Sequence, residues 1–196
     1  MSDIDLILIK KIREQTGAGV LESKEALAES GNDLDKAINL LRKKGLVKAA
    51  KKQDRATREG VIGNYLHPNK KVAALIEISC ETDFVARTED FQALAHDLAM
   101  QVAAANPQYL KPEDIPEEEL NREKEVAQES PDVKGKPDQV MEKIIQGKLE
   151  KYYQGACLLK QKFIKDEDKI IEQLLAEAVV KFGENIQIGN FIRFQL

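Results

Sequence analysis

Histidine, cysteine and aromatic residues are scarce in this sequence. Its 196 residues include two histidines, two cysteines and no tryptophan, and aromatic residues make up 5%. His67 and His96 lack the close spacing of metal ligands, and the chain has no glycine-rich phosphate loop, dinucleotide fingerprint or Gly-x-Ser-x-Gly elbow. The scarcity of catalytic motifs predicts a protein that is not an enzyme and that uses no metal or cofactor.

The two cysteines, Cys80 and Cys157, stand far apart in the chain without a Cys-x-x-Cys spacing. Two free thiols are typical of proteins in a reducing compartment. Cys80 alternates in phase with apolar residues, which favours a buried side chain over a nucleophile. No apolar run approaches the roughly 18 residues of a spanning helix, and the first residues lack the features of a secretory signal. We therefore expect a cytoplasmic protein without membrane contact.

The charge is nearly balanced, with 34 acidic and 30 basic residues and a net charge of -4. This balance gives no general attraction to nucleic acid or to anionic membranes. Residues 42–58 are a local exception, since eight basic residues there accompany one acid, Asp54. No aromatic residue is interleaved to stack on bases, which favours a solvated helical linker over an RNA-binding segment. RNA binding through these residues stays open as an alternative.

Residues 4–44 are predicted to form three short helices, because apolar residues recur there at helical spacing. The Thr16–Gly19 turn separates the first helix from the second, and a further break lies near Gly31. We expect the third helix to end at Gly45. Three helices in so few residues make a marginal independent unit, and such units usually bind something through a loop between the helices.

Beyond residue 59 the apolar pattern changes to a period of two, which predicts strands. The strands are expected at 61–66, 71–80, 157–164 and 186–194. The helices are expected around Phe91–Val102, Val140–Tyr152 and Ile170–Phe182, with Gly183 closing the last. Residues 111–136 are acidic and contain proline, so we expect an exposed arm or a poorly ordered segment.

These elements predict an α+β protein in which helices pack on a small antiparallel sheet. The expected domains are a three-helix head over residues 1–45, a basic helical linker over 46–59 and an α+β core over 60–196. Within the core, residues 107–153 are expected to form an acidic, partly exposed helical arm.

The last predicted strand has two unlike faces. Strict alternation puts four apolar residues on one face: Ile186, Ile188, Ile192 and Phe194. The opposite, less apolar face carries Gln187, Phe191 and Arg193. On this pattern we expect the first set to face the core.

Residues 81–87, Glu-Thr-Asp-Phe-Val-Ala-Arg, follow the second predicted strand. Thr82 and Asp83 can accept hydrogen bonds from the free N–H groups of a following helical turn. Capping does not explain Phe84, which stands at a strand-to-helix junction. Its ring either folds back onto the core or is presented to a partner, and the residues alone leave both alternatives open.

Several segments together resemble bacterial and organellar translation elongation factor Ts, the exchange factor of elongation factor Tu. The resemblance rests on five segments in the family's order and spacing: Arg13–Gly19, Lys48–Lys52, Cys80–Arg87, Gly183–Ile186 and Phe191–Phe194. It extends over essentially the full length of the chain.

The resemblance implies a ubiquitin-associated-like head that binds the nucleotide-binding domain of elongation factor Tu. The head residues implied in this contact are Arg13, Thr16, Gly17, Ala18, Gly19, Val20 and Leu21. The family segment that dislodges Mg²⁺ from the partner is matched by Thr82, Asp83, Phe84 and Val85, with Phe84 as the wedge. The implied function is guanine-nucleotide exchange in translation elongation: the chain binds the GDP complex, displaces Mg²⁺ and promotes GDP release so that GTP can bind.

The sequence departs from the family pattern at Val20 and Leu21, where two methionines often stand. It also resembles the short form of the family, with one core module, which implies a homodimer and a 2:2 complex with GDP-bound or nucleotide-free elongation factor Tu. No cysteine lies near the last strand, so pairing through it would be non-covalent, and Phe191 is a candidate contact. The implied location is the cytoplasm, or an organellar matrix or stroma.

Three other functions remain as alternatives. The main one is a translation or ribosome-associated adaptor that binds through the helical head without altering nucleotide affinity. The others are an RNA-binding protein that uses residues 42–58 and, last, an enzyme with Cys80 as nucleophile. The net acidity of the chain argues against RNA binding.

Overall fold

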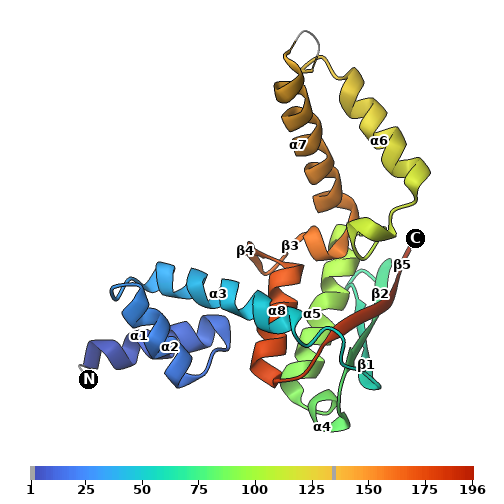
Figure 1. Cartoon of the computed structure of the whole chain (residues 1–196). Coiled ribbons are helices and arrows are strands. Elements are labelled where there is room, and N and C mark those ends of the chain that lie inside the picture. Colours follow the sequence, from blue (N-terminus) through green and yellow to red (C-terminus); the bar gives the residue numbers. More distant parts are fainter. Residues whose placement is uncertain (1–2, 134–135) are drawn as a thin grey trace.

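The computed structural model describes residues 3–133 and 136–196. The chain has the predicted α+β architecture, with a helical head at the N-terminus, a core built on an antiparallel sheet, and a projecting arm of two helices (Figure 1). The head and the core each have their own cluster of buried apolar side chains. No helix within the described ranges is both long and apolar enough to cross a membrane.

The head consists of α1 (Asp3–Thr16), α2 (Val20–Glu29) and α3 (Leu34–Ala50). Asp33 caps α3 by accepting a hydrogen bond from the backbone N–H of Lys36 over 3.0 Å. The three helices bury a shared set of small and branched apolar residues: Ile9, Ile12, Ala18, Ala26, Leu27, Ala37, Ile38 and Leu41. This small core makes the three-helix head a packed unit.

Helix α3 continues past Gly45 to Ala50, so the predicted helix end at Gly45 is wrong. Gly45 is buried where α3 packs on α8 (Ile171–Phe182), and a Cβ at this position would lie 3.6 Å from Cγ2 of Val180. A glycine inside a helix costs about 1 kcal/mol relative to alanine. Packing against α8 offsets this cost, and the helix therefore carries the chain directly into the core.

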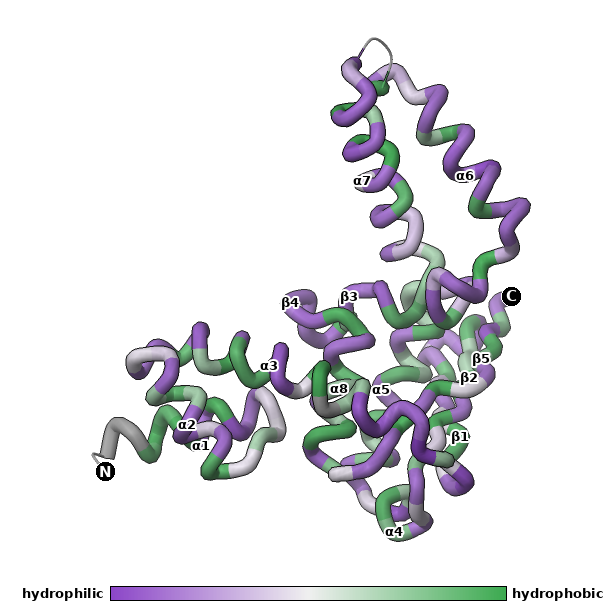
Figure 2. The backbone as a smooth tube through the Cα atoms, in the orientation of Figure 1, coloured by the Kyte–Doolittle hydropathy of each residue, from purple (hydrophilic) through white to green (hydrophobic). Residues whose placement is uncertain are grey.

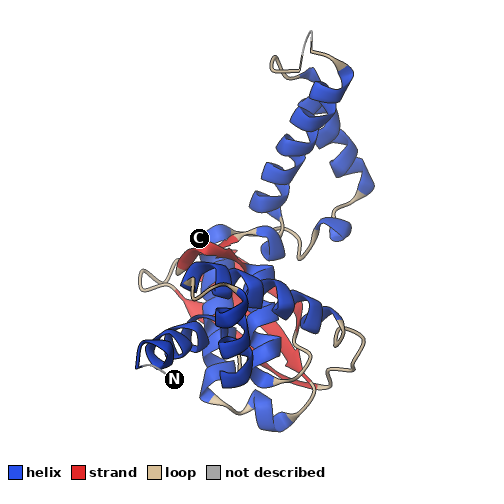
Figure 3. Ribbon diagram, turned by 60° about the vertical axis from the view of Figure 1, so that its left-hand side comes forward, coloured by secondary structure: helices blue, strands red, loops and turns tan. Residues whose placement is uncertain are grey.

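The main sheet has three antiparallel strands in the order β1-β2-β5. Their bounds are Glu59–Leu66, Val72–Cys80 and Gln187–Gln195. Helices lie against one face of this sheet (Figure 3). Among them α5 (Glu89–Ala105) packs on β1 and β2, and its close approach requires Gly63 of β1. A Cβ on Gly63 would lie 2.3 Å from the carbonyl oxygen of Ala95, so no other residue fits there without a shift.

The core lies between this covered face and α8. Phe91 of α5 meets Phe182 of α8 edge to face, with ring centroids 5.7 Å apart. Around this pair the fully buried core side chains are Ile76, Ile78, Cys80, Leu98, Ala99, Val102, Leu158 and Ile171. The predicted burial of Cys80 is confirmed, as is the end of α8 at Gly183, which has a φ of 75°.

A β-bulge in β5 reverses the faces that alternation predicts for its second half. Ile76 of β2 pairs with Phe191 and Ile78 pairs with Ile188, so β5 has one residue more than β2 between the pairs. Beyond the bulge Phe191 packs on the core, whereas Ile192 and Phe194 are 49% and 57% exposed. The predicted inward orientation of Ile192 and Phe194 is therefore wrong.

The uncovered face of the sheet carries several exposed apolar side chains, and the bulge adds Ile192 and Phe194 to them. The pairings Leu75–Ile192, Ala73–Phe194 and Ala73–Leu66 place side chains from all three strands on one side. We call this the outer sheet face, and its exposed apolar residues are Ile62, Leu66, Leu75, Ile192 and Phe194.

The predicted strand over 157–164 is mostly wrong. The chain forms a 3-10 turn over Leu158–Lys160, then a small hairpin of β3 (Lys162–Phe163) and β4 (Asp166–Ile170). The side chain of Gln101 on α5 donates to the carbonyl oxygen of Lys162 over 3.1 Å and accepts from the N–H of Ile164 over 2.9 Å. This buried amide satisfies the backbone groups that a neighbouring strand would otherwise have to pair.

The arm is an antiparallel pair of helices, α6 (Glu117–Glu129) and α7 (Asp138–Ala156), and it is mostly hydrophilic (Figure 2). The acidic stretch predicted over 111–136 is thus an exposed helix over much of its length, with residues 134–135 outside the described residues. At its base the Glu119 carboxylate accepts hydrogen bonds from the hydroxyl groups of Tyr109 and Tyr152, each over 2.6 Å. This contact ties α6 to α7 and to the core.

Candidate functional site

A short helix, α4 (Asp83–Ala86), follows β2 at the end of the core opposite the arm (Figure 1). The Phe84 side chain on this helix is 81% exposed. Its neighbours point the other way, since Val85 packs partly buried against the core and Ala86 is buried. Of the two orientations that the sequence left open, the structure has the outward one.

Thr82 and Asp83 do not cap α4 as predicted. Thr82 occupies the N-cap position with extended backbone angles, but its side chain accepts no hydrogen bond from the helix. Its hydroxyl group instead donates to Oε1 of Glu184 over 2.6 Å. The Asp83 carboxylate lies 2.9 Å from the Arg87 guanidinium, an exposed i,i+4 ion pair. The start of α4 is therefore held by a residue about a hundred positions away in the chain.

Glu184, just after α8, accepts hydrogen bonds from the backbone as well. Its Oε2 atom accepts from the N–H groups of Glu81 and Thr82, each over 3.0 Å. Gly183 makes this possible, because its positive φ turns the chain at the end of α8. The prediction of site residues omitted Glu184, and the only signal for it was the resemblance over Gly183–Ile186.

A second carboxylate, that of Glu81, makes the reciprocal contact. It accepts from the backbone N–H of Asn185 over 2.6 Å and lies 3.4 Å from the Arg55 guanidinium. The hydrogen bond from Asn185 and the nearby Arg55 charge lower the pKa of Glu81, so this side chain is ionised at neutral pH. The buried Asn185 amide donates to the carbonyl oxygens of Gln53 and Arg55 over 3.2 and 2.8 Å. The residues after α3, the end of α8 and the start of α4 thus meet at one point.

The head residues of the candidate site divide into buried and exposed ones. Thr16 is buried, and its hydroxyl group donates to the carbonyl oxygen of Ile12 over 2.7 Å and accepts from the Ala18 N–H over 3.3 Å. Ala18 is buried as well, so both shape the turn from inside. Val20 and Leu21, just beyond the turn, are 54% and 68% exposed.

The rest of the predicted head surface is also open to solvent, namely Arg13, Gly17 and Gly19. Gly17 has a φ of 67°, and a Cβ there would lie 3.2 Å from Cβ of Lys181 on α8. The turn therefore rests on α8, and Glu184, which holds the start of α4, follows two residues after the end of the same helix.

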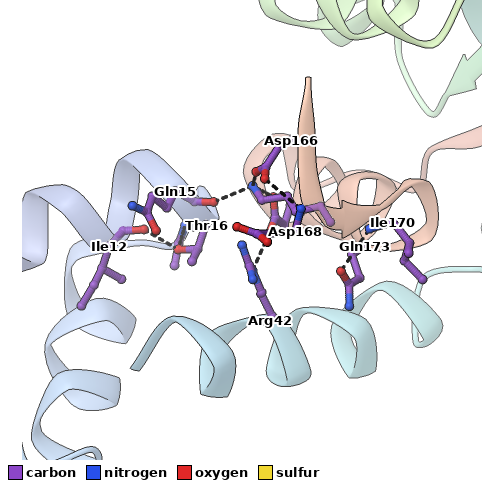
Figure 4. Close-up of polar contacts among 11 residues, drawn as sticks. Ile12, Gln15, Thr16, Arg42, Asp166, Asp168, Ile170 and Gln173 are labelled. Carbon is purple, nitrogen blue, oxygen red and sulfur yellow. Dashed lines mark hydrogen bonds and ion pairs between the residues drawn. The ribbon is translucent and has the colours of Figure 1, made fainter. Parts of the chain in front are cut away.

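A group of charged residues fixes the head against the core (Figure 4). Lys169 of β4 donates to the backbone carbonyl oxygen of Gln15 over 3.2 Å and lies 2.8 Å from the Glu177 carboxylate on α8. The other oxygen of Glu177 lies 3.4 Å from Nε of Arg42 on α3. The three charged side chains are largely buried, which strengthens their attraction and penalises the loss of any one partner.

The two cysteines are buried and not activated. The Cys80 thiol donates to the Thr82 carbonyl oxygen over 3.2 Å, and burial raises its pKa. Burial also raises the pKa of Cys157 to about 11. Over residues 3–133 and 136–196, no group of three His, Cys, Asp or Glu side chains is placed to hold a metal ion.

Comparison with known proteins gives matches over nearly the whole chain. A family model described as Elongation factor TS matches residues 14–196. The chain is 51% identical over 187 residues to Elongation factor Ts of Thermosipho melanesiensis, with 95% of each chain covered. It is 52% identical over 190 residues to Elongation factor Ts of Thermodesulfovibrio yellowstonii, with 96% of this chain and 94% of that one covered. Identity to Elongation factor Ts of Fervidobacterium nodosum is 49% over 194 residues, covering 99% and 98%.

An α+β protein with a helical head, an exposed ring at a strand-to-helix junction and these matches is a translation elongation factor. The match over residues 14–196 includes the head turn, the Thr82–Val85 segment and Glu184. The chain belongs to the elongation factor Ts family.

Proposed function

We propose that this chain is a guanine-nucleotide exchange factor for elongation factor Tu. It binds the GDP complex, displaces Mg²⁺ and promotes GDP release so that GTP can bind. The observation that carries the proposal is the outward orientation of Phe84, whose ring is 81% exposed on a helix that is itself anchored to the core. An exposed aromatic residue on a rigid support is typical of a side chain that a partner buries.

Exchange requires no covalent chemistry from this chain. A G-protein holds GDP through phosphate contacts and Mg²⁺, and it releases GDP slowly because these contacts must be lost together. An exchange factor binds the conformation in which the metal site is distorted, and by reciprocity GDP weakens its binding by the same factor. Burial of one phenylalanine ring can contribute about 2–3 kcal/mol in favour of that conformation.

The head supplies the second contact of the proposal. Val20 and Leu21 are exposed apolar residues next to the turn, where they can pack on the nucleotide-binding domain of the partner. Thr16 and Ala18 act indirectly in this scheme, because they are buried and set the shape of the turn. The head and the Thr82–Val85 segment both rest on α8 or the residues after it, so the two contacts are held at a fixed separation.

A homodimer is part of the proposal. The outer sheet face presents five exposed apolar side chains, which is more than scattered surface residues explain. Two copies that pack these faces together would remove them from water and yield a 2:2 complex with elongation factor Tu. The contacts are then Ile192 and Phe194 rather than Phe191, which packs on the core.

The test is release of a fluorescent GDP analogue from elongation factor Tu, followed by stopped flow with and without this chain. We expect release to accelerate as the chain is added, and added GDP to weaken the complex. Binding that is indifferent to GDP and leaves the release rate unchanged would support the adaptor alternative instead.

The protein would act in the cytoplasm, or in an organellar matrix or stroma, alongside its partner.

A further inference from the structure

We infer that Glu184 is a positioning residue for exchange: its carboxylate fixes the backbone of Glu81 and Thr82 so that α4 presents the Phe84 ring outward. The inference rests on the proposed function. It adds to that function a residue that never touches the partner's nucleotide and acts through Phe84.

Helix α4 cannot set its own direction. It has four residues, and an isolated helix of this length is unstable in water. It also lacks a side-chain cap, because the Thr82 hydroxyl group is turned toward Glu184. Something outside the helix must therefore determine where its first turn, and with it Phe84, points.

Glu184 meets this requirement with three hydrogen bonds. One oxygen receives the N–H groups of Glu81 and Thr82 over 3.0 Å each, and the other receives the Thr82 hydroxyl group over 2.6 Å. Two consecutive backbone N–H groups bound to one carboxylate oxygen restrict the dihedral angles between them. Hydrogen bonds to an ionised acceptor are also stronger than those between neutral groups.

The backbone on both sides of Glu184 is itself held in place. Gly183 accepts a hydrogen bond from the Lys52 ammonium group, and Asn185 binds the Gln53 and Arg55 carbonyl oxygens as well as the Glu81 carboxylate. Glu184 therefore stands between two residues that are fixed to the segment after α3. A carboxylate supported on both sides can hold Thr82 without moving when the partner presses on Phe84.

The packing of Val85 and Ala86 on the core supplies the other support of α4. That packing fixes the inner side of the helix, and the Glu81 carboxylate ties the residue before Thr82 to Asn185, while Thr82 at the N-terminal end is held by Glu184. The Glu184 contacts fix that end, so removal of the carboxylate should misdirect Phe84 while the core stays packed.

The experiment compares Glu184→Ala with Glu184→Gln in stimulated GDP release, measured over a range of exchange-factor concentrations. Glutamine can keep the geometry, because its carbonyl oxygen accepts from both N–H groups and its amide donates to the Thr82 oxygen. We expect Glu184→Ala to lower the maximal release rate by about tenfold with little change in the half-saturating concentration. We expect Glu184→Gln to stay within about threefold of the parent protein. Glu167→Ala, an exposed glutamate on β4, is the matched control and should behave like the parent.

A double-mutant cycle with Phe84→Ala shows whether Glu184 acts through the ring. If it does, Glu184→Ala causes no further loss once Phe84 is alanine. An equal loss in both backgrounds, or a parent-like maximal rate for Glu184→Ala, would overturn the inference and leave the proposed function standing. A parent-like rate for Phe84→Ala would overturn both.

Thr82→Val serves if Glu184→Ala fails to fold. It removes only the hydroxyl donor to Glu184, and Thr82→Ser retains that donor. We expect Thr82→Val to lower the maximal rate and Thr82→Ser to restore it. Equal rates for the two variants would count against the positioning role.

Discussion

Phe84 and Val85 are adjacent in the chain but face opposite surroundings: the Phe84 ring is in solvent, and the Val85 side chain packs on the core. Two consecutive residues of α4 thus differ in role: Val85 stabilises this protein, and Phe84 is free to contact another. The contribution of Phe84 to partner binding and that of Val85 to stability can therefore be measured separately.

Replacement of Phe84 by alanine should reduce stimulated GDP release by at least about tenfold, which corresponds to about 1.4 kcal/mol. The midpoint of thermal unfolding should hardly change, because the ring contributes little to the core. Val85→Ala is the matched control, with lower stability expected from the packing that it loses. Stopped-flow release and thermal unfolding of both variants check the prediction, and near-parent release by Phe84→Ala would remove the ring from the mechanism.

Asp83→Ala should have a smaller effect on exchange than Phe84→Ala. The Asp83 carboxylate makes an exposed ion pair with Arg87, and such pairs are worth about 1 kcal/mol or less. The same release assay measures the difference, with Arg87→Ala as the control for loss of the pair. A larger loss for Asp83→Ala than for Phe84→Ala would reverse the roles assigned to the two residues.

Introduction of a charge on the outer sheet face should prevent dimer formation. Ile192→Glu places a carboxylate among exposed apolar side chains that the proposed dimer buries, and burial of an unpaired charge is costly. Light scattering should then give the mass of a dimer for the parent protein and of a monomer for the variant. Phe191→Leu, a change on the core side of the same strand, should leave the mass unchanged. A monomeric parent protein would refute the proposed assembly.

Stability should depend on Glu119 at both ends of the pH range. Hydrogen bonds from Tyr109 and Tyr152 lower the pKa of Glu119 below its usual 4.5, so its contribution is present above that value and is lost as the pH falls through the lowered pKa. The same contact raises the pKa of Tyr109, and burial together with this contact raises the pKa of Tyr152, above their usual 10.0. Their contribution is present below pH 10 and is lost as the pH rises further.

Denaturant unfolding of the parent protein and of Glu119→Gln across this pH range measures the effect. We expect the difference in the free energy of unfolding to be largest between the two limits and to shrink toward each. A difference that does not vary with pH would show that the contact does not couple to ionisation.

Glu177→Gln should lower the free energy of unfolding by about 2 kcal/mol, since it removes the negative charge shared by the largely buried Lys169 and Arg42 and leaves Lys169 with the more distant Asp166 carboxylate, 3.7 Å away. Glu14→Gln, which breaks an exposed pair with Lys10, should change stability by less than about 0.5 kcal/mol. Urea unfolding of the two variants makes the comparison. Equal effects would mean that the contact between head and core is worth no more than a surface ion pair.

Helical periodicity was sufficient to predict much of the helical structure. Helices α5 and α8 follow from their apolar stripes and from Gly183, because these signals are local. The predicted end of α3 at Gly45 is wrong because packing on α8 outweighs the destabilisation that a glycine causes inside a helix. This packing involves residues distant in the sequence, so a short stretch of sequence does not reveal it. The strand over 157–164 was wrong because Gln101, distant in the sequence, satisfies its backbone.

In the candidate site, too, local features could be predicted from the sequence and long-range contacts could not. The residues pointed to Thr82–Val85 as unusual but could not orient Phe84, because the orientation depends on what Val85 and Ala86 contact. Glu184 was missed because nothing in the residue pattern around a lone glutamate after a helix indicates its partners, which lie far away in the chain. Long-range hydrogen bonds of this kind require a structure.

The extra residue of β5 has a consequence for how this lineage can change. Deleting one amino acid between Ile188 and Phe191 would place Phe191 two positions after Ile188, so strict alternation would keep Phe191 on the core and leave Ile192 and Phe194 on the outer sheet face. A three-nucleotide deletion at this point would therefore remove the bulge and preserve the proposed self-association surface.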